Sequence, residues 1–544
     1  MKKHILLALT FFIGIHNSFT QCQEIESTKV LLVGDSWAFF MGVDGTIDNV
    51  MKDWGHSGNK FMTNLTLAQN GAKTHHFLQQ EKKDEITDKL INTPSIKWVH
   101  LSLAGNDMLG NWKSQTFTQQ QTDSLLADVM EKLDSVVQFV KGVREDVQIV
   151  LSGYAYPNFE EVINGTLIPS VHPFYSNWSN MEKPSNQKIN QQLNVFTDLV
   201  ADFYSTDERI HFVPATGITQ YTYGQETALG VSPFGTYPAY SVDLPYGNPM
   251  YPSPKNSMRD YGITKDCFHL SKKGFEGLIG YTTQKYYHKA MMSDKYLLAE
   301  DPQTNGSVSN NGGISSELYL GEANGVRHKT ILTFETLYNI EYVAADASIF
   351  LHLASQTGGN PVDGQMLVEI NDQAFGVSAT IETGDFSEAG KASANPCVFG
   401  SNKVDKWVRL DLPQNLLEYI TVNNITQFKL SAPNAVGALV QFSGVEDSDF
   451  APVLNITYGE EAVTALAEDV LSQQIKIYPN PSREFIEISV EMAEFEEIVL
   501  FTIDGKQILR GKEQLIDVSN LPQGTYIVNV VTSKGVHTEK LIKM

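Results

Sequence analysis

The chain has 544 residues, enough for about two to four domains of ordinary size. A hydrophobic fraction of 42% with 19% charged residues is typical of a globular protein and excludes a disordered one. The formal net charge of −23 repels polyanions, so we expect no nucleic-acid partner.

The N-terminus has the pattern of an export signal. Two lysines, Lys2 and Lys3, precede an apolar run over residues 5–15, and small residues follow. This pattern predicts a secretory signal peptide over residues 1–20. A lipoprotein anchor at Cys22 is the alternative, although the residues just ahead of it are not the small ones that such an anchor needs. No later segment is long and apolar enough to predict a membrane span.

Cysteine and histidine spacing gives no sign of a metal site. The three cysteines, Cys22, Cys267 and Cys397, are too few and too scattered for a disulfide framework or a thiolate site, so we expect buried free thiols. His75 and His76 are adjacent, which points their side chains in different directions. The sequence therefore predicts no metal and no cofactor.

From about residue 28 to residue 296, short apolar runs alternate with amphipathic segments. Strands are predicted at Val30–Val33, Leu65–Ala68, Trp98–Ala104, Val147–Tyr154 and Ile210–Val213. Residues 123–143 carry apolar side chains with a 3.6-residue period, which predicts a helix. Strands separated by helices predict a five-stranded parallel sheet covered on both faces, with a ligand site at the carboxyl ends of its strands.

Ser36 directly follows the first of these strands, after Gly34 and Asp35. A serine where a strand turns into a helix points its hydroxyl over the end of the sheet, which is a common place for a nucleophile. A serine needs a base and an orienting partner to react. Asp266 and His269 have a spacing that lets the carboxylate reach the imidazole in a turn before the last predicted helix, residues 275–287. An ordinary turn and a helix-capping carboxylate are the simpler interpretations of each pattern alone.

Two further loops follow predicted strands. Gly71 can bring its backbone N–H close to a substrate, and Asn106 offers an amide side chain. Together with the N–H of Ser36, these donors would form an oxyanion hole, which acyl transfer requires. Left-handed turn residues are the alternative for both.

These blocks, in this order, resemble those of the SGNH/GDSL hydrolase family: Gly34-Asp35-Ser36, Gly71, Gly105-Asn106-Asp107 and Asp266-x-x-His269. The resemblance covers about half of the chain, residues 27–298, and implies a flavodoxin-like three-layer α/β domain. It implies Ser36 as nucleophile, His269 as general base and acid, and Asp266 as the residue that orients His269. It also implies an oxyanion hole of Ser36, Gly71 and Asn106, with Asp35 and Asp107 bracing the loops.

Two features depart from that family. Trp37 is bulkier than the usual residue at its position, and we expect it in the wall of the acyl pocket as a substrate-binding residue. The stretch from Tyr154 to Gly262 is longer than a minimal member needs, and residues 221–261 are rich in tyrosine and proline. These prolines and glycines predict a loop that borders the active site, where tyrosines would stack on sugars or line an acyl pocket. A loop packed by its own aromatic residues is equally compatible.

Residues 306–459 contain short strand-like runs between turns and few helical periods, which predicts a jelly-roll β-sandwich. Residues 305–313, at its start, are interpreted as a linker or a turn-rich entry. Its strand runs resemble the DNRLRE-type modules of secreted proteins, some linked with carbohydrate binding; a structural spacer is the alternative. Residues 460–473 form an acidic connector. In the tail, strand-like runs alternate with turn residues at 475–482, 500–506 and 521–528, and Asp504-Gly505 predicts a hairpin. With these segments, residues 474–544 resemble the C-terminal sorting domain of the type IX secretion system of Bacteroidota. The resemblance implies a small β-sandwich, contact with that secretion machinery, and a secreted or cell-surface location.

The sequence therefore predicts a secreted serine esterase that acts through an acyl-enzyme, with deacetylation of a polysaccharide as the favoured activity. A lipid or short-chain carboxylester hydrolase is the first alternative. A surface binding protein without turnover is the second, and it requires Ser36 and His269 to lie beyond hydrogen-bond distance, or a loop to fill the site.

Overall fold

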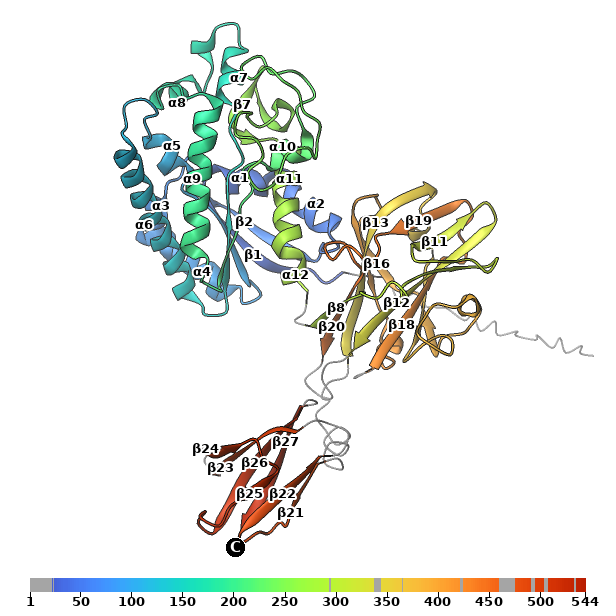
Figure 1. The fold of residues 1–544 in the computed structure, drawn as a ribbon. Helices are drawn as coiled ribbons and strands as arrows, with labels where there is room; N and C mark the ends of the chain where they lie inside the picture. The colour runs from blue at the N-terminus through green and yellow to red at the C-terminus, as the bar shows by residue number, and fades with distance from the viewer. Residues whose placement is uncertain are drawn as a thin grey trace, which may run out of the picture.

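The computed structural model describes residue 22 and residues 24–544, apart from 293–294, 337–343, 364, 421–423, 459–474, 491–494, 503–506 and 533–534. The expected signal peptide and acidic connector lie outside the described residues. Figure 1 shows three folded parts: an α/β unit, a β-sandwich and a small C-terminal β unit.

A five-stranded parallel sheet forms the centre of the α/β unit, in the order β2-β1-β3-β4-β5. Its strands are β1 (Ser27–Gly34), β2 (Asn59–Ala68), β3 (Trp98–Ser102), β4 (Gln148–Ser152) and β5 (Ile210–Val213). Each contains an apolar run that the sequence predicted as a strand, and the order is the flavodoxin-like one, so the predicted fold class is confirmed. The order of the strands reverses at β1, since β2 lies on one side of it and β3 to β5 lie on the other. Such a switch point predicts a binding crevice at the carboxyl ends of β1 and β3.

Helices cover both faces of this sheet (Figure 1), with α1, α2 and α11 on one side and α4, α6 and α9 on the other. The helices of the unit are α1 (Ser36–Gly42), α2 (Thr46–Asp53), α3 (Thr74–Phe77), α4 (Gln80–Asn92), α5 (Gly105–Asn111), α6 (Gln119–Val143), α7 (Phe159–Asn164), α8 (Tyr175–Asn180), α9 (Asn186–Tyr204), α10 (Ile218–Tyr223), α11 (Lys272–Thr282) and α12 (His288–Ala290). The long helix α6 starts at a capping box, in which Thr118 and Gln121 bond each other's backbone N–H. Among the described residues, none of the helices has both the length and the apolar character needed to cross a membrane.

The β-sandwich consists of antiparallel strands, and the long strand β13 belongs to both of its sheets. The strands are β8 (Lys295–Leu298), β9 (Gly306–Ser309), β10 (Ile314–Ser315), β11 (Leu318–Ala323), β12 (Val326–Thr336), β13 (Ala344–Gly358), β14 (Leu367–Asn371), β15 (Ala392–Ala394), β16 (Cys397–Gly400), β17 (Trp407–Asp411), β18 (Asn424–Ser431), β19 (Ala438–Phe442) and β20 (Val453–Tyr458). Residues 305–313, expected to be a linker or a turn-rich entry, contain strand β9 and the turn that leads from it into its partner β10.

The C-terminal unit packs two antiparallel sheets around an apolar core. One sheet holds β21 (Ile475–Tyr478), β22 (Phe485–Val490) and β25 (Leu515–Asp517); the other holds β23 (Phe495–Thr502), β24 (Gln507–Gly511), β26 (Gly524–Thr532) and β27 (Gly535–Lys543). Strands β23 and β24 pair as the predicted hairpin, whose turn lies outside the described residues.

The β-sandwich packs directly against the α/β unit. Trp54 stacks on Trp407 at 5.9 Å between ring centroids, within a small core that also contains Phe350. Beside it, Arg409 donates hydrogen bonds to the Gly55 carbonyl and to Glu24, both at 2.9 Å. These contacts combine apolar burial with charge-assisted bonds, so the sandwich is part of one packed body with the α/β unit.

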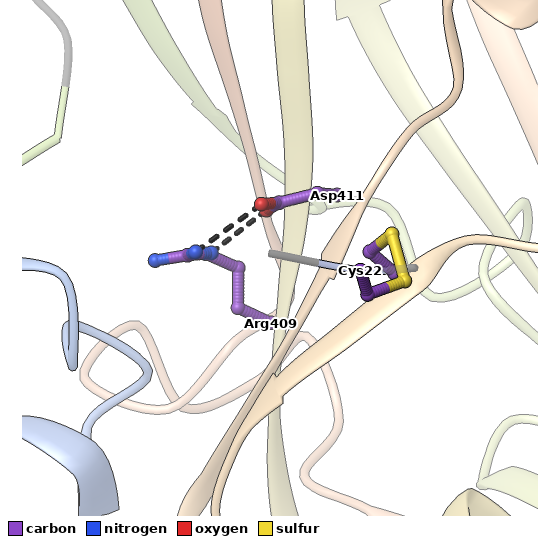
Figure 2. The surroundings of a disulfide bond; sticks show 4 residues. Cys22, Arg409 and Asp411 are labelled. Carbon is purple, nitrogen blue, oxygen red and sulfur yellow. Dashed lines mark hydrogen bonds and ion pairs between the residues drawn. A yellow bond between two sulfur atoms is a disulfide. The ribbon is translucent and has the colours of Figure 1, made fainter. Parts of the chain in front are cut away.

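A disulfide bond between Cys22 and Cys397 joins the segment before β1 to strand β16 of the sandwich. Figure 2 shows it beside the ion pair of Arg409 and Asp411. The expectation of three free thiols is therefore wrong for two of them, because distance along the chain says nothing about distance in the fold; Cys267 is free and buried. The bond also occupies the sulfur that a lipoprotein anchor at Cys22 would need, and it is typical of an oxidising compartment.

Candidate active site

The loop that carries Ser36 is built by a glycine that no other residue could replace. Gly34 ends β1 with a φ of +148°, and a Cβ atom there would lie 1.9 Å from the Ser102 carbonyl oxygen of β3. Asp35 then caps helix α1 by accepting a hydrogen bond from the Trp37 N–H at 2.9 Å. Ser36 is the first residue of α1, where its N–H has no acceptor within the helix.

Ser36, His269 and Asp266 form one chain of hydrogen bonds. The Ser36 hydroxyl lies 2.7 Å from Nε2 of His269, and Nδ1 of His269 lies 2.8 Å from Oδ2 of Asp266. The other oxygen of Asp266 accepts hydrogen bonds from the N–H groups of Phe268 and His269, at 2.8 and 2.9 Å. Asp266 is fully buried and bonded on both oxygens, so it holds the imidazole ring in one orientation.

Asp266 and His269 lie in strand β7 (Thr264–Leu270), and not in the turn that the sequence suggested. This strand pairs with β6 (Met258–Tyr261) as a hairpin, and its register shifts between Met258 and Asp260. Helix α11 begins only at Lys272. The Asp266 carboxylate still reaches the His269 imidazole, because its other oxygen bonds the backbone N–H groups of Phe268 and His269 and so holds the carboxylate beside the ring.

The two other expected loop residues face the same cavity as Ser36. Gly71 follows β2 with a φ of +74°, which favours glycine, and Asn106 lies in the first turn of α5. The Asn106 amide donates one hydrogen bond to the Ala72 carbonyl at 3.0 Å, which fixes the side chain and leaves its second hydrogen for another acceptor.

Tyr154, just beyond the end of β4, joins the serine loop to the asparagine loop. Its hydroxyl donates to Oδ2 of Asp35 at 2.7 Å and accepts from the Gly105 N–H at 2.9 Å. Burial raises the pKa of the Asp35 carboxyl to about 6, although its hydrogen bonds from Tyr154 and from the Trp37 N–H lower that pKa. Burial also raises the pKa of the Tyr154 hydroxyl well above its ordinary value. Asp107 braces the neighbouring loop, since its two oxygens accept from the Thr74 N–H and hydroxyl, each at 2.9 Å.

A cavity of about 230 Å³ opens over Ser36 and His269. Apolar side chains and asparagine amides share its wall. The lining residues are Ser36, Asn70, Gly71, Asn106, Leu109, Gly110, Phe159, Phe174, Asn177, Asn180, Met181, Phe268 and His269.

Trp37 does not lie in the wall of this cavity, which corrects the expectation of a substrate-binding role. It is fully buried beneath the site, with edge contacts to the rings of Tyr154, Phe268 and Phe275 at centroid distances of 5.1 to 5.9 Å. A residue one position after an outward-facing serine on a helix points to a different side, here into the core. Trp37 therefore supports the floor of the cavity from below.

The tyrosine-rich loop also differs from its expected place. Its members pack on one another, as in the pairs Tyr221–Tyr240 and Tyr237–Tyr251, at 5.2 and 4.8 Å between centroids, and none of them lines the cavity. The wall comes instead from an earlier part of the same insertion, residues 159–181, which contributes Phe159, Phe174, Asn177, Asn180 and Met181. This segment has no motif; only its position after the carboxyl end of β4 could have indicated it. Tyr154 also lies just after the carboxyl end of β4, and this position is the one feature of the sequence that could have indicated its role.

Comparison with protein-family models finds one match at the C-terminal end: residues 476–544 match the secretion system C-terminal sorting domain. This match identifies the C-terminal unit as a sorting domain and indicates a secreted or cell-surface protein, typical of Bacteroidota. No curated protein matches the chain.

Several solved structures resemble the α/β unit. A family 3 carbohydrate esterase from Clostridium thermocellum is 13% identical, covers 49% of this chain and 99% of its own, and has a TM-score of 0.26. A carbohydrate esterase of family 3 from Talaromyces cellulolyticus is 13% identical, with 48% and 98% covered and a TM-score of 0.26. An extracellular lipase from Streptomyces rimosus is 14% identical, with 47% and 99% covered and a TM-score of 0.26. At such low scores the chemistry of this chain has to be argued from its own side chains.

Proposed function

We propose that this chain is a secreted serine hydrolase of carboxylic esters that acts through an acyl-enzyme. The single observation that carries the proposal is the contact chain from the Ser36 hydroxyl through His269 to buried Asp266, at 2.7 and 2.8 Å, at the base of an open cavity. The alternative of a binding protein without turnover needs a broken contact or a filled site. Both the short distance and the open cavity favour catalysis instead.

In the proposed reaction, His269 takes the Ser36 proton on Nε2 while the serine oxygen attacks the ester carbonyl. The N–H groups of Ser36 and Gly71 and the second amide hydrogen of Asn106 stabilise the negative oxygen. The alcohol leaves with the proton from His269, and the acyl group remains on Ser36. His269 then takes a proton from water, and the oxygen of that water attacks the acyl ester carbonyl. The bond to the Ser36 oxygen breaks, His269 returns the proton to that oxygen, and the acid is released.

The cavity favours a lipid-type or short-chain carboxylic ester as substrate. Its volume of about 230 Å³ suits a small acyl group, and the rings of Phe159, Phe174 and Phe268 give it apolar walls. None of the tyrosines of residues 221–261, which favoured sugar recognition, lines this cavity; Tyr261 contacts Phe174 of the wall but does not itself form the wall. Deacetylation of a polysaccharide is the second candidate, supported by the amides of Asn177 and Asn180, which can bond sugar hydroxyls.

Hydrolysis of p-nitrophenyl acetate by the wild type and by Ser36→Ala tests the proposed reaction. We expect the substitution to lower kcat by about a thousandfold or more, because it removes the nucleophile. Ser124→Ala, an exposed serine on α6, is the matched control and should have wild-type activity. Equal rates for the wild type and Ser36→Ala would rule out the proposed mechanism. A panel of tributyrin, phospholipid, acetylated xylan and acetylated pectin then separates the two substrate candidates.

A further inference from the structure

A group of exposed aliphatic side chains lies on two segments that also carry residues of the cavity wall. Leu167 is 98% exposed, Val171 72% and Ile168 54%, all on the loop between α7 and α8. Ile263 is completely exposed at the tip of the β6–β7 hairpin. Figure 1 shows the segment between α7 and α8 projecting from the end of the α/β unit that carries α5, α8 and β7. We call these four residues the aliphatic tip.

The loop and the hairpin that form the aliphatic tip are bonded to each other. Nε2 of His172 lies 3.2 Å from both the Thr264 hydroxyl and the Lys265 carbonyl oxygen, and the rings of Phe174 and Tyr261 are 5.6 Å apart between centroids. The tip is therefore one surface carried by two connected segments.

The same two segments build the catalytic cavity. Phe174 lines its wall and lies 6.2 Å from the His269 ring, and β7 carries both His269 and Asp266. A partner that covers the aliphatic tip will therefore contact the same two segments that carry Phe174 and His269.

The chemistry of the tip selects an apolar partner. Residues 162–181 contain no lysine, arginine, aspartate or glutamate, in a chain that is 19% charged. The hairpin next to Ile263 carries an ion pair, Lys265 with Asp260 at 2.7 Å, so its charges are matched. Leucine, isoleucine and valine cannot hydrogen-bond a sugar, and exposed aliphatic groups on uncharged loops are suited to entering the surface of a lipid layer. The net charge of −23 disfavours an anionic layer.

We propose that the aliphatic tip inserts into the surface of a neutral or zwitterionic lipid aggregate and so places the cavity mouth against ester groups at that surface. This inference rests on the proposed esterase function and narrows its substrate class to esters presented in aggregated form. The hydrolytic step itself is unchanged.

Binding to phosphatidylcholine vesicles, measured by flotation of the full chain, tests the insertion. We expect the wild type to float with the vesicles, and the double variant Leu167→Ser/Ile263→Ser to partition at least about tenfold less, since each buried aliphatic side chain is lost. Ile91→Ser/Val195→Ser is the matched control: both residues are exposed aliphatics, on α4 and α9, outside the tip. It should bind as the wild type does.

Kinetics separate failure of this inference from failure of the proposed function. On soluble p-nitrophenyl acetate, the tip variant and the wild type should have equal kcat/KM. On tributyrin, wild-type activity should rise when the substrate passes its solubility limit, and the tip variant should lose this rise. A wild type that does not float, a tip variant that floats equally well, or tip-dependent binding to xylan without vesicle binding would each overturn the inference. Activity on p-nitrophenyl acetate that survives Ser36→Ala would overturn the proposed function instead.

Discussion

The hydroxyl of Tyr154 connects the two loops on which the proposed reaction depends. One of its bonds holds Asp35, next to the proposed nucleophile Ser36, and the other holds Gly105, next to the proposed oxyanion donor Asn106. Gly105 itself leaves room for the ring, since a Cβ atom there would lie 2.7 Å from Tyr154. Tyr154 touches no substrate position, so we regard it as a positioning residue.

We predict that Tyr154→Phe lowers kcat on p-nitrophenyl acetate by about ten- to a hundredfold with little change in KM, because small displacements of reacting groups are costly. Tyr156→Phe is the matched control. Tyr156 is also buried after β4, but its hydroxyl bonds the Tyr246 carbonyl and Asn194. Equal kcat values for the two variants, or a loss confined to KM, would refute a positioning role for Tyr154.

The residues that form the proposed reaction centre could be found from the sequence because each has a chemically distinctive neighbourhood. Ser36 follows a buried strand, and Asp266 and His269 have a spacing that allows direct contact. Trp37 could not be placed, since its burial depends on rings from β7 and α11 that are remote in sequence. Asn177 and Asn180, which line the cavity, carry no local signal for the same reason: only folding brings α8 to the cavity.

At the scale of elements, strands β1 and β3 approach more closely at Gly34 than any side chain allows. The Asp35 N–H bonds the Ser102 carbonyl at 2.8 Å, and the Gly34 carbonyl accepts from the Gln69 N–H at 2.9 Å. The end of β1 is thus bonded to both of its neighbours in the sheet. These backbone hydrogen bonds fix the position of Ser36 relative to the carboxyl end of the sheet.

We predict that Gly34→Ala yields little folded protein, because its Cβ would overlap the Ser102 carbonyl at 1.9 Å. Gly142→Ala is the control variant, and we expect it to raise the free energy of unfolding instead of lowering it. Gly142 lies in α6 with nothing within 4 Å of an added Cβ, so the substitution should stabilise the fold by roughly 0.5–1 kcal/mol. Urea denaturation of both variants and the wild type measures these changes. A Gly34→Ala protein as stable as the wild type would contradict the close approach of β1 and β3.

Elements with strong periodicity were predictable, and those defined by pairing were not. The helix expected over residues 123–143 is α6, and the apolar runs of the parallel sheet are its five strands. The segment at 305–313 could not be assigned between a linker and a turn-rich entry, because its composition suits a linker and a hairpin turn equally. Its pairing with β12 is a contact that composition does not encode.

At the scale of the whole molecule, two buried histidines meet where the α/β unit contacts the sandwich. Nε2 of His56 lies 3.0 Å from Nδ1 of His288, and both rings contact Phe350 of β13. Burial, with the Arg409 charge, lowers the pKa of His56 to about 3, and burial lowers the pKa of His288 well below its ordinary value. Both rings are therefore neutral in the folded protein near neutral pH.

Because both histidines are buried in the neutral form, we expect the free energy of unfolding to fall as the pH is lowered. Below the ordinary histidine pKa of 6.5 the unfolded chain binds protons that the folded chain does not, so stability is complete above pH 6.5 and falls as the pH drops toward 3. The two histidines contribute up to about 2.7 kcal/mol per pH unit. We expect Tm measured from pH 8 to pH 4.5 to fall less steeply in His56→Asn than in the wild type. His75→Asn, at an exposed histidine of α3, should retain the wild-type slope; equal slopes for all three proteins would contradict the prediction.

The bond between Cys22 and Cys397 encloses every residue of the proposed reaction centre in one covalent ring. A protease outside the cell that cut the chain once within this ring, for instance at the exposed loop between α7 and α8, would leave two fragments that cannot diffuse apart. The folded protein would then survive a single cut for as long as its surroundings remained oxidising. Resistance of the folded chain to proteolysis would therefore depend on the redox potential of the surroundings as well as on the free energy of unfolding.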